Sequence, residues 1–224
     1  MMNEGIRLLN SGQYERALTY LLDIDVSAEQ YPQLSYYLGL CYTHMGKYDE
    51  ALLYLEQVVG SELSFSHIFQ ARMILGYIYA VTRRFRLAEF EFRHLLDEGF
   101  DSARARSALA YVLHSQGELQ EAIEELERAI ELDPENGNAL NSLGFILADH
   151  EIDARRAADL CRRAVQRSPK NASYLDSLGW ALYKLGQAEQ ARDILRDALD
   201  LAPRNKEIAS HLREVMYGKP EARS

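Results

Sequence analysis

The stretch LDSLGWALYKLGQAEQAR, from Leu175 to Arg192, decides how this chain is interpreted. Its apolar residues recur at three- and four-residue steps, a spacing that predicts helix. The stretch nevertheless contains two glycines, and a glycine inside a helix costs roughly 0.5–1 kcal/mol relative to alanine. Gly179 and Gly186 therefore need an explanation, as does Trp180, the only tryptophan in the chain.

The same pattern recurs along the chain and explains Gly179. A column of small residues repeats at steps of 34 to 37 residues, and a column of alanines follows it. A small side chain lets two helices pack closely, and a larger one would overpack the pair by roughly 1–3 kcal/mol. The first column is Gly5, Gly39, Gly76, Ala110, Gly144 and Gly179. The second column is Ala17, Ala51, Ala88, Ala122, Ala157 and Ala191.

Other recurring residues predict where the helices turn and end. Glycine accepts the left-handed conformation that ends a helix, and proline cannot continue a helix. The turn glycines are Gly12, Gly46, Gly117 and Gly186, and the later repeats end at Pro134, Pro169 and Pro203. Arg83 replaces the turn glycine of the third repeat, and the fifth repeat has one extra residue within 149–153. Three extra residues near 60–67 lengthen another joint, where we expect the chain to flex.

This pattern resembles the tetratricopeptide repeat family. Its large, small, apolar and proline positions are matched by Leu175, Leu178, Gly179, Leu182, Ala191, Leu195 and Pro203. The resemblance extends to about residue 203 and implies an all-α fold, in which six helical hairpins stack into a right-handed superhelix. We expect repeats at 1–31, 32–65, 66–102, 103–135, 136–169 and 170–203, a capping helix at 204–217, and a disordered tail at 218–224.

The residue after each small residue lies off the packed stripe of its helix. The family architecture directs this column, which is Leu40, Tyr77, Tyr111, Phe145 and Trp180, into a concave groove. These side chains either stiffen the stack or form an aromatic ladder that binds a peptide, because a contiguous apolar strip usually marks an interaction site. The predicted peptide-binding residues are Tyr36, Leu40, Tyr77, Arg104, Tyr111, His114, Asn138, Asn141, Phe145, Trp180 and Tyr183.

Members of the family that bind chaperone tails hold a C-terminal carboxylate with lysines, asparagines and an arginine on three consecutive first helices. This chain departs from that set, since the matching slots hold Tyr36, Leu40, Met73, Tyr77, Arg104 and Ala108. We therefore expect the ligand to be an apolar or aromatic-rich segment, or an amphipathic helix, rather than an acidic tail.

The sequence contains no motif for catalysis or metal binding. It has no H-E-x-x-H, no C-x-x-C and no phosphate loop, so we predict no catalytic residue, no metal site and no cofactor. Cys41 and His44 are spaced to share a metal, but two ligands without a third favour a packed cysteine. Cys41 and Cys161 are interpreted as buried free thiols. The net charge of −9 argues against nucleic-acid binding, and no apolar run is long enough to span a membrane.

These observations predict an interaction scaffold or adaptor that binds a protein or peptide and is not an enzyme. A self-assembling structural scaffold remains an alternative, as does an enzyme or sensor with a closed pocket near 60–67. Segments 138–149, 174–195 and 207–218 also resemble the C-terminal repeats of bacterial multi-repeat proteins, some of which present substrates to envelope proteases. The start of the chain lacks a secretory signal, which predicts a cytoplasmic location, or a periplasmic one if an upstream signal is removed.

Overall fold

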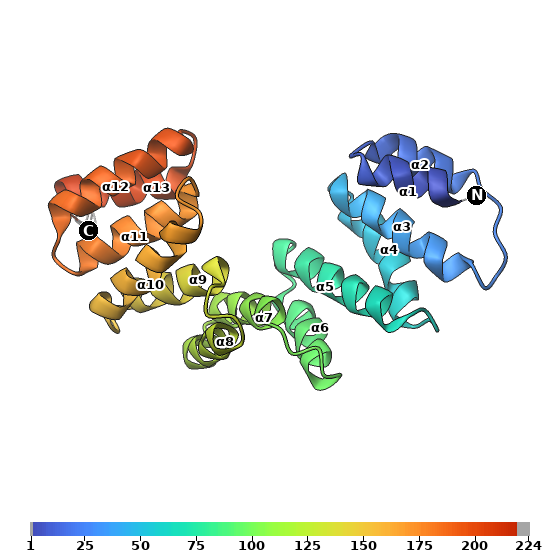
Figure 1. The fold of residues 1–224 in the computed structure, drawn as a ribbon, viewed down its shortest axis with the longest axis horizontal. Coiled ribbons are helices and arrows are strands. Elements are labelled where there is room, and N and C mark those ends of the chain that lie inside the picture. Colours follow the sequence, from blue (N-terminus) through green and yellow to red (C-terminus); the bar gives the residue numbers. More distant parts are fainter. Residues whose placement is uncertain (1, 219–224) are drawn as a thin grey trace, which may run out of the picture. The chain divides into compact units, whose positions relative to one another are not determined.

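The computed structural model describes residues 2–218, and all regular structure in that range is helical, as the sequence predicted (Figure 1). Of the tail expected at 218–224, residues 219–224 lie outside the described range. The helices are α1 (Met2–Asn10), α2 (Tyr14–Leu22), α3 (Tyr31–His44), α4 (Tyr48–Val59), α5 (Phe65–Val81), α6 (Phe85–Asp97), α7 (Ala103–Gln116), α8 (Leu119–Leu132), α9 (Gly137–Asp149), α10 (Ala154–Arg167), α11 (Ala172–Lys184), α12 (Ala188–Leu201) and α13 (Lys206–Tyr217).

The small column packs each first helix closely against the second helix of its hairpin. A Cβ added at Gly39 would lie 2.7 Å from Leu55, and one at Gly179 would lie 2.6 Å from Leu195. Real side chains do not approach this closely, so a larger residue would push the helices apart. For each glycine of the column, the partner is thus the residue four positions after the alanine column, a leucine, phenylalanine or cysteine, while the alanines themselves are fully buried.

Two hairpins are braced by equivalent ion pairs. Arg72 on α5 donates to Glu91 on α6 at 2.9 Å, and Arg106 on α7 donates to Glu125 on α8 at 2.6 Å. All four side chains are largely buried. Removing one member of a pair would therefore leave the charge of the other buried without compensation. The spacing of 34 residues between the two pairs is the repeat length itself.

The turn positions adopt the left-handed backbone that the sequence predicted. Gly46 has φ of 70° and Gly186 has φ of 84°. Arg83 occupies the same turn position in the third hairpin with φ of 61°, and Glu151 has φ of 54° in the lengthened turn of the fifth. A residue with a Cβ in this conformation costs roughly 1–2 kcal/mol, so both turns are strained.

We therefore expect Arg83→Gly to stabilise the protein by about 1 kcal/mol, because glycine adopts the left-handed conformation without steric cost. Thermal unfolding followed by far-UV circular dichroism measures the change. The matched control is Gly46→Arg, which places the same side chain at the equivalent turn and should lower the stability by a similar amount. An Arg83→Gly variant no more stable than the parent would contradict this account of the turn.

The later hairpins begin with side-chain caps. The Oδ1 atom of Asn171 accepts from the backbone N–H groups of Ser173 and Tyr174 at the start of α11. Asn136 and Asn205 cap α9 and α13 in the same way. Each cap satisfies amide groups that have no partner within the helix. The prolines at 134, 169 and 203 lie just beyond the preceding helices, so Pro and Asn together set where one hairpin ends and the next begins.

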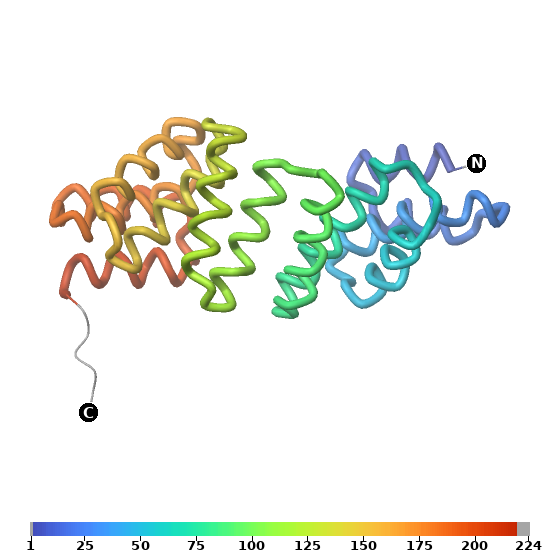
Figure 2. The backbone as a smooth tube through the Cα atoms, turned by 90° about the horizontal axis from the view of Figure 1, so that it is seen from below, coloured from blue at the N-terminus to red at the C-terminus, as the bar shows by residue number. Residues whose placement is uncertain are grey.

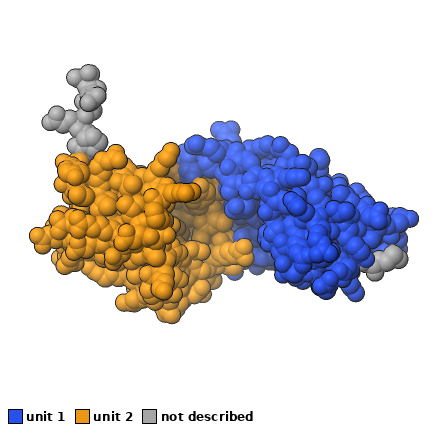
Figure 3. All heavy atoms as spheres, turned by 90° about the horizontal axis from the view of Figure 1, so that it is seen from above, with its two compact units in different colours: residues 1–101, 115–117 blue, residues 102–114, 118–224 orange. Residues whose placement is uncertain are grey.

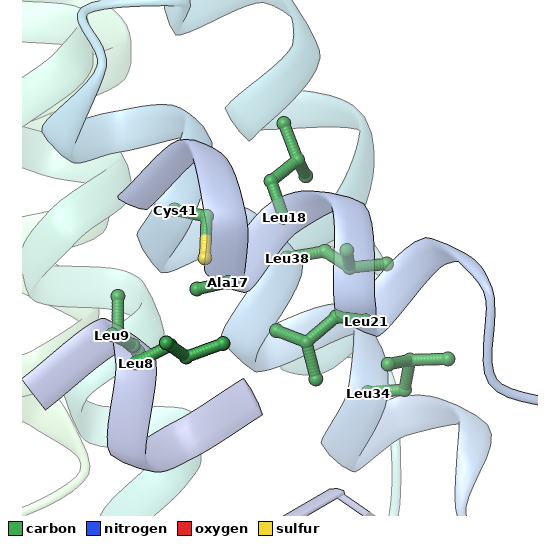
Figure 4. Packing of buried hydrophobic residues seen from close by; sticks show 8 residues of the cluster. All are labelled: Leu8, Leu9, Ala17, Leu18, Leu21, Leu34, Leu38 and Cys41. Carbon is green, nitrogen blue, oxygen red and sulfur yellow. The ribbon is translucent and has the colours of Figure 1, made fainter. Parts of the chain in front are cut away.

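The N-terminal hairpin has a core of leucines shared with the next helix. Figure 4 shows Leu8 and Leu9 of α1 in one cluster with Ala17, Leu18 and Leu21 of α2, and α3 completes the cluster through Leu34, Leu38 and Cys41. Because neither hairpin buries its apolar face alone, each contributes to the core of its neighbour.

The chain divides into two compact units, coloured separately in Figure 3. The first comprises residues 1–101 and 115–117 and contains α1 to α6, and the second comprises residues 102–114 and 118–224. Figure 2 follows the backbone through the successive hairpins within each unit. The division falls after Asp101, whereas the sequence led us to expect the looser joint at 60–67, which lies inside the first unit.

Candidate functional site

The second unit contains a hollow of about 220 Å³ on the side formed by α7, α9, α11 and α13. Four of the predicted peptide-binding residues meet there: Tyr111, His114, Asn141 and Phe145. Tyr111 is exposed over 58% of its surface and Phe145 is half-buried. We call this feature the α7–α13 hollow. Its lining residues are Tyr111, His114, Leu126, Asn141, Ser142, Phe145, Ile146, Ser173, Asp176, Ser177, Asn205, Glu207 and Ile208.

Asn141 brings an unsatisfied acceptor to this hollow. Its Oδ1 atom is buried and has no hydrogen-bond partner among the described residues. A buried polar atom without a partner costs about 1–3 kcal/mol, and a donor that reached it would recover part of this cost.

Asp176 closes one side of the hollow through a pair with the last helix. His211 of α13 donates from Nδ1 to the Asp176 carboxylate at 2.9 and 3.1 Å. Burial alone would lower the pKa of His211, but its hydrogen bond to Asp176 and the charges of Asp176, Glu207 and Asp149 raise it above the usual value. The raised pKa favours the imidazolium form beside the carboxylate, and the pair ties α13 to α11.

Trp180 does not face open space, which corrects the expectation that it extends an exposed ladder. It is only 4% exposed, its ring stacks on His211 with centroids 4.4 Å apart, and its Nε1 atom donates to Asp149 at 3.0 Å. Lys184 covers the ring from 4.9 Å. The physical reason is α13, which lies over this position because the stack ends there. Trp180 belongs to the packing of the cap, and the rings of Tyr111 and Phe145 line the hollow.

The other residues predicted in the second unit lie apart from the hollow. The Asn138 Oδ1 atom accepts from the Tyr174 hydroxyl at 2.6 Å, which ties α9 to α11. Tyr183 lies beside Trp180 and lines a separate depression with Lys184. Arg104 is exposed in the first turn of α7 and does not line the hollow.

His114 lies at the edge of the hollow and pairs with His150, with the two Nε2 atoms 3.2 Å apart. Burial, followed by repulsion from a charged His150, lowers the pKa of His114. The lowered pKa favours the neutral form of His114, which can share a single N–H···N hydrogen bond with His150.

The three residues predicted in the first unit differ in exposure. Tyr36 is buried, donates to Gln70, and has its pKa raised to about 12 by burial. Leu40 is half-buried against the N-terminal leucine core. Tyr77 is 51% exposed, and a hydrogen bond to Tyr48 raises its pKa. Of the three, Tyr77 alone presents an open ring, and Tyr36 departs from the expectation of an exposed contact.

Both cysteines are free and buried, as the sequence indicated. Burial raises the pKa of Cys41 to about 11 and that of Cys161 to about 12. Because the thiolate is the reactive form, neither side chain is suited to nucleophilic chemistry. No helix in the described part of the chain is both long and apolar enough to cross a membrane.

Family models match most of the chain. A TPR repeat model matches residues 102–150, and two tetratricopeptide repeat models match residues 151–215 and 2–62. The chain belongs to the tetratricopeptide repeat family. No curated protein matches the sequence of this TPR chain.

Solved TPR structures share this fold at low sequence identity. YrrB, a TPR protein with an unusual peptide-binding site, is 18% identical with a TM-score of 0.60, covering 89% of this chain and 97% of that one. MamA from Desulfovibrio magneticus is 23% identical with a TM-score of 0.65, covering 75% and 92%. TTC0263, a thermophilic TPR protein from Thermus thermophilus, is 16% identical with a TM-score of 0.64, covering 83% and 98%.

Sequence reasoning missed the contribution of α13 to the hollow, although a signal was present. Ser107, Asn141 and Asp176 occupy one register of successive first helices, and His211 follows at the same spacing of 35 residues. The capping helix therefore continues the first-helix register of the TPR repeats. Extending the repeat columns beyond Pro203 would have placed His211 beside Asp176 and Ile208 at the wall.

Proposed function

We propose that this TPR chain is a protein-interaction module that binds a peptide or protein segment in the α7–α13 hollow and catalyses no reaction. The observation that carries the proposal is the convergence of Tyr111, Phe145 and Asn141 on one hollow. Aromatic side chains supply the contact area at binding hot spots, and the amide fixes the register of a bound backbone.

The composition of the hollow supports a segment of chain as ligand more than a small molecule. Its lining mixes aromatic and aliphatic groups with serines and asparagines from four successive first-register helices. An extended or helical segment can contact all four helices at once. The unusual peptide-binding site of YrrB, which shares this fold, is consistent with such a use of stacked TPR hairpins.

The test is selection of a random-peptide display library on the immobilised protein, followed by affinity measurement for the best peptide. We expect Tyr111→Ala with Phe145→Ala to weaken that peptide by about tenfold or more, since buried aromatic contacts dominate such interfaces. The matched control is Leu53→Ala with Phe90→Ala, which removes exposed apolar groups from α4 and α6 of the first unit.

Circular dichroism verifies that both double variants retain their helices. Trp180 is left unchanged because its burial would turn a binding test into a stability test. Equal affinity of the parent and the Tyr111/Phe145 variant would place the binding site elsewhere. A library with no enriched peptide would overturn the proposal that the hollow binds peptides.

A further inference from the structure

The α7–α13 hollow has an acidic wall. Asp176 and Glu207 are its charged lining residues, and among the described residues no lysine or arginine lines it. His114 also lines the hollow. Burial and the neighbouring His150 lower the pKa of His114, which favours its neutral form. A ligand with a negative charge would meet the Glu207 carboxylate here, while the Asp176 carboxylate is paired with His211.

Three carboxylates near this wall raise the pKa of His211. The charges that act on His211 are those of Asp176 on α11, Asp149 at the end of α9, and Glu207 on α13 itself. One imidazolium compensates one carboxylate, and its hydrogen bonds go to Asp176. The nearby ammonium of Lys184 is bonded to Glu151 at 2.7 Å. Within the described lining, the exposed Glu207 carboxylate forms no ion pair with a lysine or arginine.

Glu207 is placed to meet a ligand. It lies in the first turn of α13, its backbone N–H is capped by Asn205, and its side chain is exposed at the wall. The neighbouring Ile208 is buried and continues the apolar surface of Phe145 and Ile146 into the hollow. An apolar contact and a negative charge thus lie side by side.

We propose that the hollow binds a segment in which an apolar or aromatic anchor residue lies next to a lysine or arginine. This inference rests on the proposed function and adds the chemistry of the partner. The anchor packs against Tyr111 and Phe145, and the cationic side chain lies beside Glu207. Charge complementarity of this kind selects the partner more than it adds affinity.

The experiment determines which residue types are enriched in the peptides selected on the intact protein. We expect lysine or arginine to be enriched beside an enriched apolar position, and aspartate and glutamate to be depleted there. The best peptide is then remade with glutamine in place of its basic residue, and both forms are measured by fluorescence anisotropy at low and high salt. The basic form should lose affinity with salt while the glutamine form changes little.

A variant assigns the effect to one carboxylate. Glu207→Gln should weaken the basic peptide about three- to fivefold, the range of an exposed ion pair, and should leave the glutamine form within about twofold. Glu124→Gln, on the exposed face of α8, is the matched control and should change neither affinity.

The outcomes separate the two proposals. Enriched peptides with acidic or neutral residues beside the anchor would overturn the basic-partner inference and leave the proposed function standing. The same holds if Glu207→Gln and Glu124→Gln behave alike toward a basic peptide. A failure to enrich any peptide would overturn both.

Discussion

Gly144→Val is expected to lower the free energy of unfolding of the second unit by about 3 kcal/mol. A Cβ at this position would lie 2.5 Å from the Sγ atom of Cys161 and 3.0 Å from the carbonyl oxygen of Ala157. The carbonyl belongs to the backbone of α10, so α10 itself must shift. Replacing a helical glycine returns at most about 1 kcal/mol of helix propensity, which offsets only part of the overpacking.

Trp180 provides the measurement, because the only tryptophan in the chain is buried in the same unit. Urea unfolding followed by tryptophan fluorescence reports the stability of the second unit. Gln120→Val, at an exposed position of α8, is the control for placing a β-branched residue in a helix, and it should cost less than about 1 kcal/mol. An unchanged unfolding midpoint for Gly144→Val would mean that α9 and α10 tolerate wider spacing.

The hairpins could be predicted from the sequence because their causes are local and repeated. A small residue, a turn glycine and a stopping proline each act within one hairpin, and their recurrence fixes the period. Arg83 illustrates the strength of this logic: its backbone is left-handed although its side chain disfavours that state, because the hairpin around it imposes the turn.

The site was predicted only in part because exposure depends on what covers each residue. Tyr111 and Trp180 occupy the same register, yet one is 58% exposed and the other 4%. The difference comes from α13, which packs over α11 and places His211 on the Trp180 ring. Equivalent positions in successive repeats direct their side chains the same way. Their exposure still differs, because the element that covers the position differs between Tyr111 and Trp180.

The division into two units was also not predicted. The lengthened segment at 60–67 suggested a joint, yet aromatic packing of Phe65 and Phe69 against Phe100 holds that segment within the first unit. Insertion length alone does not mark the boundary between compact units, because inserted residues can contribute rings to the packing beside them.

His211→Ala is expected to destabilise the second unit by about 3 kcal/mol, because it leaves the Asp176 carboxylate buried without its partner. Asp176 is only 6% exposed, and within residues 2–218 His211 is the side chain that donates to it. The same substitution removes the ring that stacks on Trp180, so the tryptophan emission should also shift toward that of an exposed indole. His67→Ala, in the first unit, serves as the control and should leave the emission unchanged.

The dependence of this effect on pH follows from the raised pKa of His211. A group whose folded-state pKa is raised contributes its full stabilisation below the unfolded pKa of about 6.5, and loses it as the pH rises through the folded value. The stability difference between the parent and His211→Gln should therefore be largest below about pH 6.5 and shrink toward alkaline pH. His114, whose pKa is lowered, acts in the opposite direction in both proteins and cancels in this difference. A difference that grew with pH would mean that Asp176 and His211 do not form a charged pair, and that α13 is held on α11 by apolar packing alone.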